Sequence, residues 1–259
     1  MSAATQRRPS PALGSFESVL DAGEKWLAWI DDAERFHAIL KDKIPWEQLD
    51  ATSKAAVQAR LKASAPTSQL LLNSLYLTMA SAFEEFLRSI IQESATHLST
   101  RKTKYEDMNA ELRNLHLREA ARLLRRLDAR PDYLAVTTED LCSAIGSCVP
   151  GSVAVRLCEP ALGDVDGLIR LESFFERMKA LGQPMSFDVI ANDAGVVGAL
   201  KLTGSPTRTV AKALKHCVEA VSKNRNRIAH MGSSAADVDR TLIGDHRQVL
   251  KAVSLAICS

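Results

Sequence analysis

Glycine, proline and aromatic residues are all scarce in this chain. Its 259 residues include 12 glycines and 9 prolines, and Phe, Trp and Tyr together make up 5%. An all-β fold needs many tight turns rich in glycine and proline, so the composition disfavours that class. An excess of charge of one sign is also missing, because the formal net charge is only +2. Any surface that attracts a nucleic acid must therefore be local.

Long apolar runs and paired cysteine motifs are missing as well. The most apolar stretch, residues 70–83, contains polar residues and is too short to span a bilayer, so no membrane association is expected. Residues 1–15 carry arginines without a following apolar segment, which indicates a disordered tail and not a secretion signal. The five cysteines form no CxxC pair. We therefore expect reduced thiols, no metal site, no cofactor and a cytoplasmic location.

Helical periodicity, by contrast, runs along most of the sequence. The strongest pattern starts from a cap at Thr67 or Ser68 and continues through Ile90. Other helices are expected over residues 16–43, 47–62, 109–128, 164–181, 206–230 and 235–257. Residues 142–160 and 182–204 should be mainly loop, with a short strand or helical turn at 187–190. Since strands and helices do not alternate, the sequence predicts an all-α helical bundle.

The predicted 206–230 helix ends with an arginine, an amide and a histidine. Arg225 falls about 40° from the apolar Val221, which puts an arginine on the buried stripe. Asn226 and His230 are four positions apart and share a face, so the amide is expected to hydrogen-bond the imidazole. Arg225 and His230 lie about 140° apart on an ideal helix, so one substrate can meet both only if the helix bends or two chains contribute.

These three groups suit the cleavage of RNA without a metal ion. RNA carries its own nucleophile, the 2′-OH. A histidine can take or give the proton, and an arginine can stabilise charge that develops on the phosphate. The spacing is weak evidence by itself, because Arg240 and His246 fit it too. A basic helix end that complements the helix dipole is the structural alternative.

Two segments carry a resemblance to a known family. RNRIAH (Arg225–His230) resembles the R-N-x-x-A-H form of the motif in HEPN-domain ribonucleases. LYLTMASAFEEFLRSII (Leu75–Ile91) is similar to the apolar helix, with a Phe-Glu-x-Phe-Leu core, of the RiboL-PSP-HEPN branch. Many members have glycine directly after the histidine, whereas Met231 precedes Gly232 here. This departure bears on the local turn more than on the chemistry.

The resemblance implies a HEPN-type bundle that forms a homodimer, with two Arg/His pairs facing a cleft. It also implies a metal-independent endoribonuclease of a toxin–antitoxin or antiviral defence system, in which Arg225 and His230 are catalytic and Asn226 is supporting. An antitoxin or other regulatory protein is then an expected partner. The corresponding division of the chain is a disordered tail (1–15), an N-terminal helical extension (16–65) and a HEPN-like domain (66–259).

Basic residues around the motif are candidates for RNA contact. Between Arg208 and His230 only Glu219 opposes the cations. The candidates are Lys215, Lys223 and Arg227. We expect these side chains to bind phosphates, although a helix face that is exposed to solvent explains their positions equally well.

A second basic stripe includes Arg122 and could follow an RNA backbone. Glu84 and Glu85 could pair with Arg225 or Arg88, or face water. The competing hypothesis for the whole chain is a non-catalytic helical module that dimerises or docks a partner and keeps the motif as structure.

Overall fold

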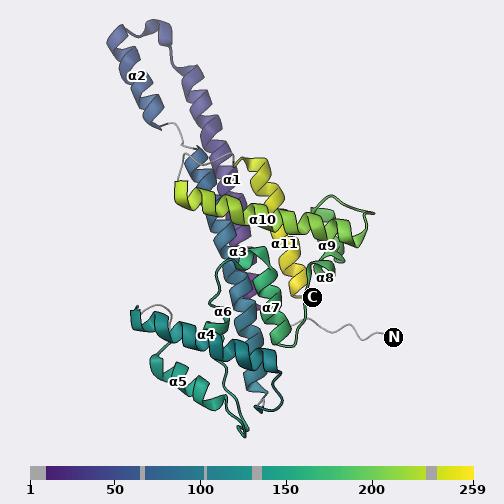
Figure 1. Cartoon of the computed structure of the whole chain (residues 1–259). Coiled ribbons are helices and arrows are strands. Elements are labelled where there is room, and N and C mark those ends of the chain that lie inside the picture. Colours follow the sequence, from purple (N-terminus) through teal and green to yellow (C-terminus); the bar gives the residue numbers. More distant parts are fainter. Residues whose placement is uncertain (1–9, 65–67, 102–103, 130–135, 232–237) are drawn as a thin grey trace.

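The computed structural model describes residues 10–64, 68–101, 104–129, 136–231 and 238–259. Over these ranges the chain consists of helices and contains no strand, which confirms the all-α class. None of the described helices has the length and apolar character that a membrane crossing requires. Figure 1 shows an elongated molecule in which α3 (Ser68–Thr100) runs through most of its length.

Helix α3 is the central element of the core. Helices α1, α6, α7, α10 and α11 all contact it. Its buried side chains recur every three or four residues: Leu72, Tyr76, Met79, Phe83, Phe86 and Ile90. The predicted stripe had Leu75 in place of Tyr76, and Leu75 is only partly buried. The rings at positions 83 and 86 lie 5.6 and 5.5 Å from the ring of Phe16 on α1. Both phenylalanines are therefore core residues and not platforms for nucleobases.

Helix α1 (Pro11–Lys43) begins earlier than the sequence suggested. The Ser10 side chain accepts a hydrogen bond from the Leu13 N–H, and Pro11 occupies the first turn. The predicted disordered tail is therefore wrong for residues 11–15, while residues 1–9 lie outside the described ranges. Phe16 and Leu20 are buried in the same cluster as the α3 side chains. The boundary predicted at residue 65 thus divides helices that share one core.

The second half of α1 extends beyond the other helices, together with η1 (Trp46–Gln48) and α2 (Ala51–Ser64) (Figure 1). The imidazole Nε2 of His37 lies 3.0 Å from the carbonyl oxygen of Leu61, which connects α1 to α2. Trp26 and Ile39, which belong to the helical pattern of this segment, are more than half exposed. The apolar residues of α1 therefore do not all face the core.

Helices α4 (Ala110–Ala129), α5 (Thr138–Ser147) and α6 (Glu159–Gly163) form a lobe with a smaller apolar cluster of its own. Helix α5 begins where Thr137 and Thr138 predict a helix start, with the Thr137 side chain accepting the Asp140 N–H, and it continues into the predicted 142–160 loop. At the base of the lobe, Glu119 and Arg177 form an ion pair of 3.1 Å in which each side chain is only 5% exposed.

The single helix predicted over residues 164–181 is wrong. The segment instead forms η2 (Leu168–Arg170) and α7 (Glu172–Ala180), separated by Leu171 with φ of 70°. A left-handed leucine is costly, but its side chain is fully buried in the main core, which holds it there.

The last part of the chain carries two short and two long helices. Residues 182–204 contain α8 (Phe187–Ala191) and α9 (Ala194–Ala199), so the element at 187–190 is a helical turn and not a strand. Helix α10 (Thr207–Met231) follows, and α11 (Arg240–Ile257) begins at an Asp239 cap. Residues 235–237, predicted as the start of this last helix, lie outside the described ranges.

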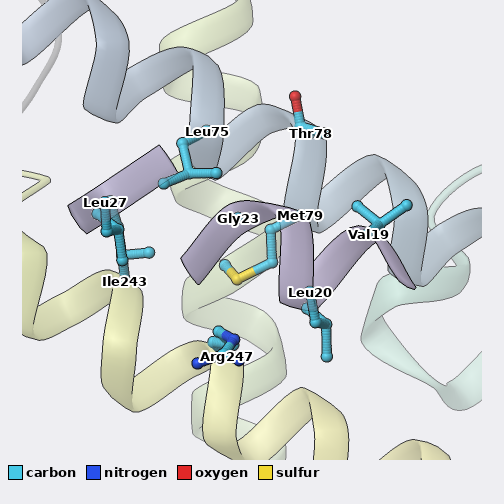
Figure 2. Close-up of a pocket in the computed structure, with 9 residues that line it drawn as sticks. All are labelled: Val19, Leu20, Gly23, Leu27, Leu75, Thr78, Met79, Ile243 and Arg247. Atoms are coloured by element: carbon cyan, nitrogen blue, oxygen red, sulfur yellow. The ribbon is translucent and has the colours of Figure 1, made fainter. Parts of the chain in front are cut away.

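Helices α1, α3 and α11 meet at a narrow apolar slot, shown in Figure 2. Gly23 faces α3 so closely that a Cβ atom there would lie 3.2 Å from Leu75 Cδ1. Arg247 of α11 lies at the slot and pairs with Glu24 of α1 at 2.7 Å. Through these contacts the first and last helices pack together against α3.

Candidate active site at the end of helix α10

The last two turns of α10 present all three residues of the motif. Helix α10 is continuous to Met231, so no break separates Arg225 from His230. Arg225 and Asn226 are partly buried, and His230 is exposed. The position of Gly232, and with it the turn after the histidine, lies outside the described residues.

Arg225 is held at the edge of the core and not inside it. Its Nη2 donates to Glu84 Oε2 at 3.4 Å and its Nη1 donates to Asn226 Oδ1 at 3.0 Å. The Arg225 side chain keeps 38% of its surface exposed, against 13% for Glu84. The guanidinium is therefore oriented by two neighbours while one side of it remains open to solvent. Glu85 pairs with Arg88 at 2.5 Å and is 61% exposed, so both predicted roles of the glutamates occur.

His230 stands apart from this group. Asn226 accepts from Arg225, and among the described residues no hydrogen bond joins it to His230, so that expectation is wrong. The uninterrupted helix keeps the angle of about 140° between Arg225 and His230. Within one chain, then, the two side chains leave α10 in different directions.

A buried polar network lies directly beneath the motif. Tyr76 Oη of α3 is 2.7 Å from His246 Nδ1 of α11, and Asn224 Nδ2 of α10 donates to the same hydroxyl at 3.4 Å. Burial raises the pKa of Tyr76 to about 12 and lowers the pKa of His246. The imidazole is therefore neutral near pH 7, and it has a structural role.

Arg240 and His246, the second Arg/His pair of the sequence, have structural roles. Arg240 forms ion pairs with Asp31 and Glu34 of α1, each at 2.7 Å, while His246 is 7% exposed. Sequence reasoning did not place His246 in the core, although it shares an apolar stripe with Ile243 and Leu250. The spacing of positions 243, 246 and 250 matches one face of a helix, so this pattern could have predicted that His246 is buried.

The predicted RNA-binding residues do not form one surface. Lys223 lines a polar hollow of about 550 Å³ that also involves Arg170, Glu172 and Glu219. Lys215 lies next to it and pairs with Glu172 at 2.9 Å.

Arg227 is partly buried on α10, and the charge of its side chain acts on Tyr76. Arg122 lies on α4, away from α10, where it pairs with Glu119 at 3.2 Å and donates to the Asp164 carbonyl oxygen. Its charge is therefore already used inside the protein.

The described residues contain no group of three or more His, Cys, Asp or Glu side chains arranged to hold a metal ion. All five cysteines are free thiols, and Cys158 is buried. Comparisons of the chain with protein-family models, with curated proteins and with solved structures gave no match in any of the three.

Proposed function

We propose that this protein is a metal-independent endoribonuclease of the HEPN type that acts through Arg225 and His230. One observation carries the proposal: the two segments that resemble the family meet in space. Glu84, from the segment on α3, holds Arg225, from the motif on α10, at 3.4 Å. A family-like helix and a family-like motif that orient one another support a shared role better than either segment alone.

In the proposed reaction the 2′ oxygen of a ribose attacks the adjacent phosphorus atom, and the bond from phosphorus to the 5′ oxygen breaks. A base takes the proton of the 2′-OH, and an acid gives a proton to the leaving oxygen. The products are a 2′,3′-cyclic phosphate and a 5′-hydroxyl end. Arg225 stabilises the charge on the non-bridging oxygens. Its guanidinium group is held in orientation by Glu84 and Asn226.

The angle between the side chains favours a site made by two copies. Since Arg225 and His230 leave a continuous helix about 140° apart, we infer that Arg225 of one copy works with His230 of the other. Two histidines in one cleft would also supply an acid and a base together. The proposed enzyme is therefore a homodimer.

The hollow beside α10 gives the RNA strand a path to the histidine. Lys223 and His230 lie two turns apart on nearly the same face, about 20° from one another. Lys223 and Arg170 can contact phosphates, and the carboxylates of Glu172 and Glu219 can accept from ribose hydroxyls or base amino groups. Lys223 is thus the strongest of the predicted RNA-binding residues.

A cytoplasmic toxin or antiviral effector is the setting that we propose, following the family resemblance. An unregulated endoribonuclease would degrade the RNA of its own cell. A neutralising antitoxin or an activating partner is therefore part of the proposal.

The second candidate is a non-catalytic helical module. It is favoured by the ion pair of Arg225 with Glu84, because a motif arginine neutralised by a neighbouring carboxylate can serve packing alone. In this case the removal of His230 would change neither folding nor any activity.

The test is cleavage of end-labelled total and transfer RNA in EDTA. Arg225→Ala and His230→Ala should each lower the rate at least about 100-fold, and His230→Ala, at an exposed position, should change the melting temperature little. His216→Ala is the matched control, because His216 is also exposed on α10, and it should cleave like the wild type. Product ends should be cyclic phosphates. Cleavage that survives in His230→Ala, or no cleavage by the folded wild type on any of these RNAs, would contradict the proposal.

A further inference from the structure

A hollow of about 340 Å³ lies between α4 and α7, and we call it the α4–α7 hollow. Small-molecule sites in proteins usually measure about 300–1,000 Å³, so its size is at the lower end of that range. Its polar lining consists of three cations, two carboxylates and one amide: Arg118, Arg177, Lys179, Glu111, Glu176 and Asn114. These residues belong to α4 and α7, and none of them belongs to α10.

The buried cation of the hollow is Arg177, whose side chain is only 5% exposed. Its Nη2 pairs with Glu119 Oε1 at 3.1 Å, while its Nε has no hydrogen-bond partner among the described residues. Buried polar groups normally find partners, because each unpaired donor costs free energy. Arg177 is therefore a buried guanidinium that is short of acceptors.

Glu119 is shared among three arginines. Arg118 Nε donates to the same Oε1 atom at 3.2 Å, and Arg122 Nε lies 3.2 Å from Oε2. Arg122 has Asp164 as a second partner, at 3.7 Å, so the deficit of negative charge falls on Arg118 and Arg177. Burial lowers the pKa of Arg177, and the charge and hydrogen bond of Glu119 only partly offset this effect. Both undercompensated arginines line the α4–α7 hollow.

The two arginines are placed to hold one tetrahedral anion. Because they contact the same oxygen atom of Glu119, their guanidinium groups lie side by side. Arg118 is 69% exposed, and its terminal nitrogens donate no hydrogen bond among the described residues. Adjacent guanidinium groups match the oxygen atoms of a phosphate, which accept charge-assisted hydrogen bonds. Lys179 adds a third positive charge at the same hollow.

The carboxylates of the lining select against a bare anion. Glu111 is 59% exposed and pairs with Lys179 at 2.8 Å, and Glu176 is exposed. A carboxylate accepts hydrogen bonds only, so both can bind hydroxyl groups of a ligand but repel a second anionic group. The amide of Asn114 can donate as well as accept. The lining therefore suits a molecule with one anionic end and a hydroxylated body.

We propose that the α4–α7 hollow binds a small phosphate monoester that carries hydroxyl groups. Sugar phosphates and nucleoside monophosphates share this chemistry. Arg118 and Arg177 bind the phosphate, and Glu111, Glu176 and Asn114 bind the hydroxyl groups. In Figure 1, α4 lies nearer to one end of the molecule than α10 does, so this site is separate from the proposed active site.

The experiment is isothermal titration calorimetry of the full chain with ribose 5-phosphate and with adenosine monophosphate. At least one of them should bind with a Kd below about 1 mM, and inorganic phosphate, ribose and adenosine should each bind at least about tenfold more weakly. Arg118→Ala should weaken the monoester at least about tenfold, because it removes charge-assisted hydrogen bonds at an exposed position. Arg125→Ala is the matched control, since Arg125 is exposed on the same helix but does not line the hollow.

The proposal is wrong if both monoesters have a Kd above about 1 mM, or if inorganic phosphate or the phosphate-free forms bind as tightly. Equal effects of Arg118→Ala and Arg125→Ala would contradict it too. Lys223→Glu should leave the Kd unchanged, and loss of binding in this variant would place the ligand at α10 and overturn the proposal. RNA cleavage is not a readout here, so failure of the proposed nuclease activity leaves these outcomes unchanged.

Discussion

The buried histidine of α4 should make this protein unstable in mild acid. His116 is fully buried, and burial lowers its pKa from 6.5 to about 4. Its Nε2 accepts the backbone N–H of Cys158 at 3.0 Å, so a proton on this nitrogen would remove the hydrogen bond and bury a charge. Nδ1 has no hydrogen-bond partner among the described residues that could share that charge.

The sign and size of the effect follow from the two pKa values. Because the folded-state pKa lies below the unfolded value, the unfolded chain binds more protons between about pH 4 and pH 6.5. Stability is therefore complete above this value and is lost as pH falls toward 4. Between pH 7 and pH 5, the shift from 6.5 to about 4 corresponds to a loss of about 2 kcal/mol.

The assay is urea unfolding at pH 7, 6 and 5, with His116→Gln as the comparison. Glutamine places a non-titrating oxygen near the position of Nε2, so the acceptor for Cys158 is kept. The pKa of His246 is also lowered, but its contribution is present in both proteins and cancels in the difference. The wild type should lose about 2 kcal/mol more than the variant. If wild type and His116→Gln lose the same free energy of unfolding between pH 7 and pH 5, the reasoning is refuted.

Two further predictions concern the surroundings of the motif. Tyr76→Phe removes the hydroxyl that contacts His246 Nδ1 and should lower the free energy of unfolding by about 1–3 kcal/mol, measured in urea at pH 7.5. A change below about 0.5 kcal/mol would mean that the network contributes little. Lys223→Glu should weaken the binding of single-stranded RNA and flatten its salt dependence, whereas Lys104→Glu, at an exposed position far along the chain, should do neither. Equal effects of the two variants in a filter-binding assay would exclude a specific role for Lys223.

Helical periodicity predicted the class and most helices, because burial of one face imposes it directly. It failed where a local backbone state decides the outcome. Leucine rarely adopts positive φ, so the amino-acid sequence of residues 164–181 did not indicate the break at Leu171. The early start of α1 depended on a hydrogen bond from Leu13 to the Ser10 side chain, a residue that resembled part of a polar tail.

The candidate site was predictable as a set of residues but not as a set of contacts. Arg225 and Asn226 are adjacent, and their hydrogen bond uses the amide that the i, i+4 rule assigned to His230. The partner of Arg225 on α3 is distant in sequence, and such a pair depends on how helices cross. Periodicity does not contain that information. The same holds for Trp26 and Ile39 of α1, where the pattern alone could not distinguish core from surface.

Helix α11 completes the packing around α1, and this has a consequence for folding during synthesis on the ribosome. The hydrogen bond from Arg247 to Glu24 spans 223 positions in sequence. At about 5–20 residues per second of synthesis, α1 leaves the ribosome roughly 10–45 s before the helix that completes its slot. During this interval Leu20, which lines the slot, lacks its full cover. Chaperone binding to the first helix is therefore expected to end when α11 is released.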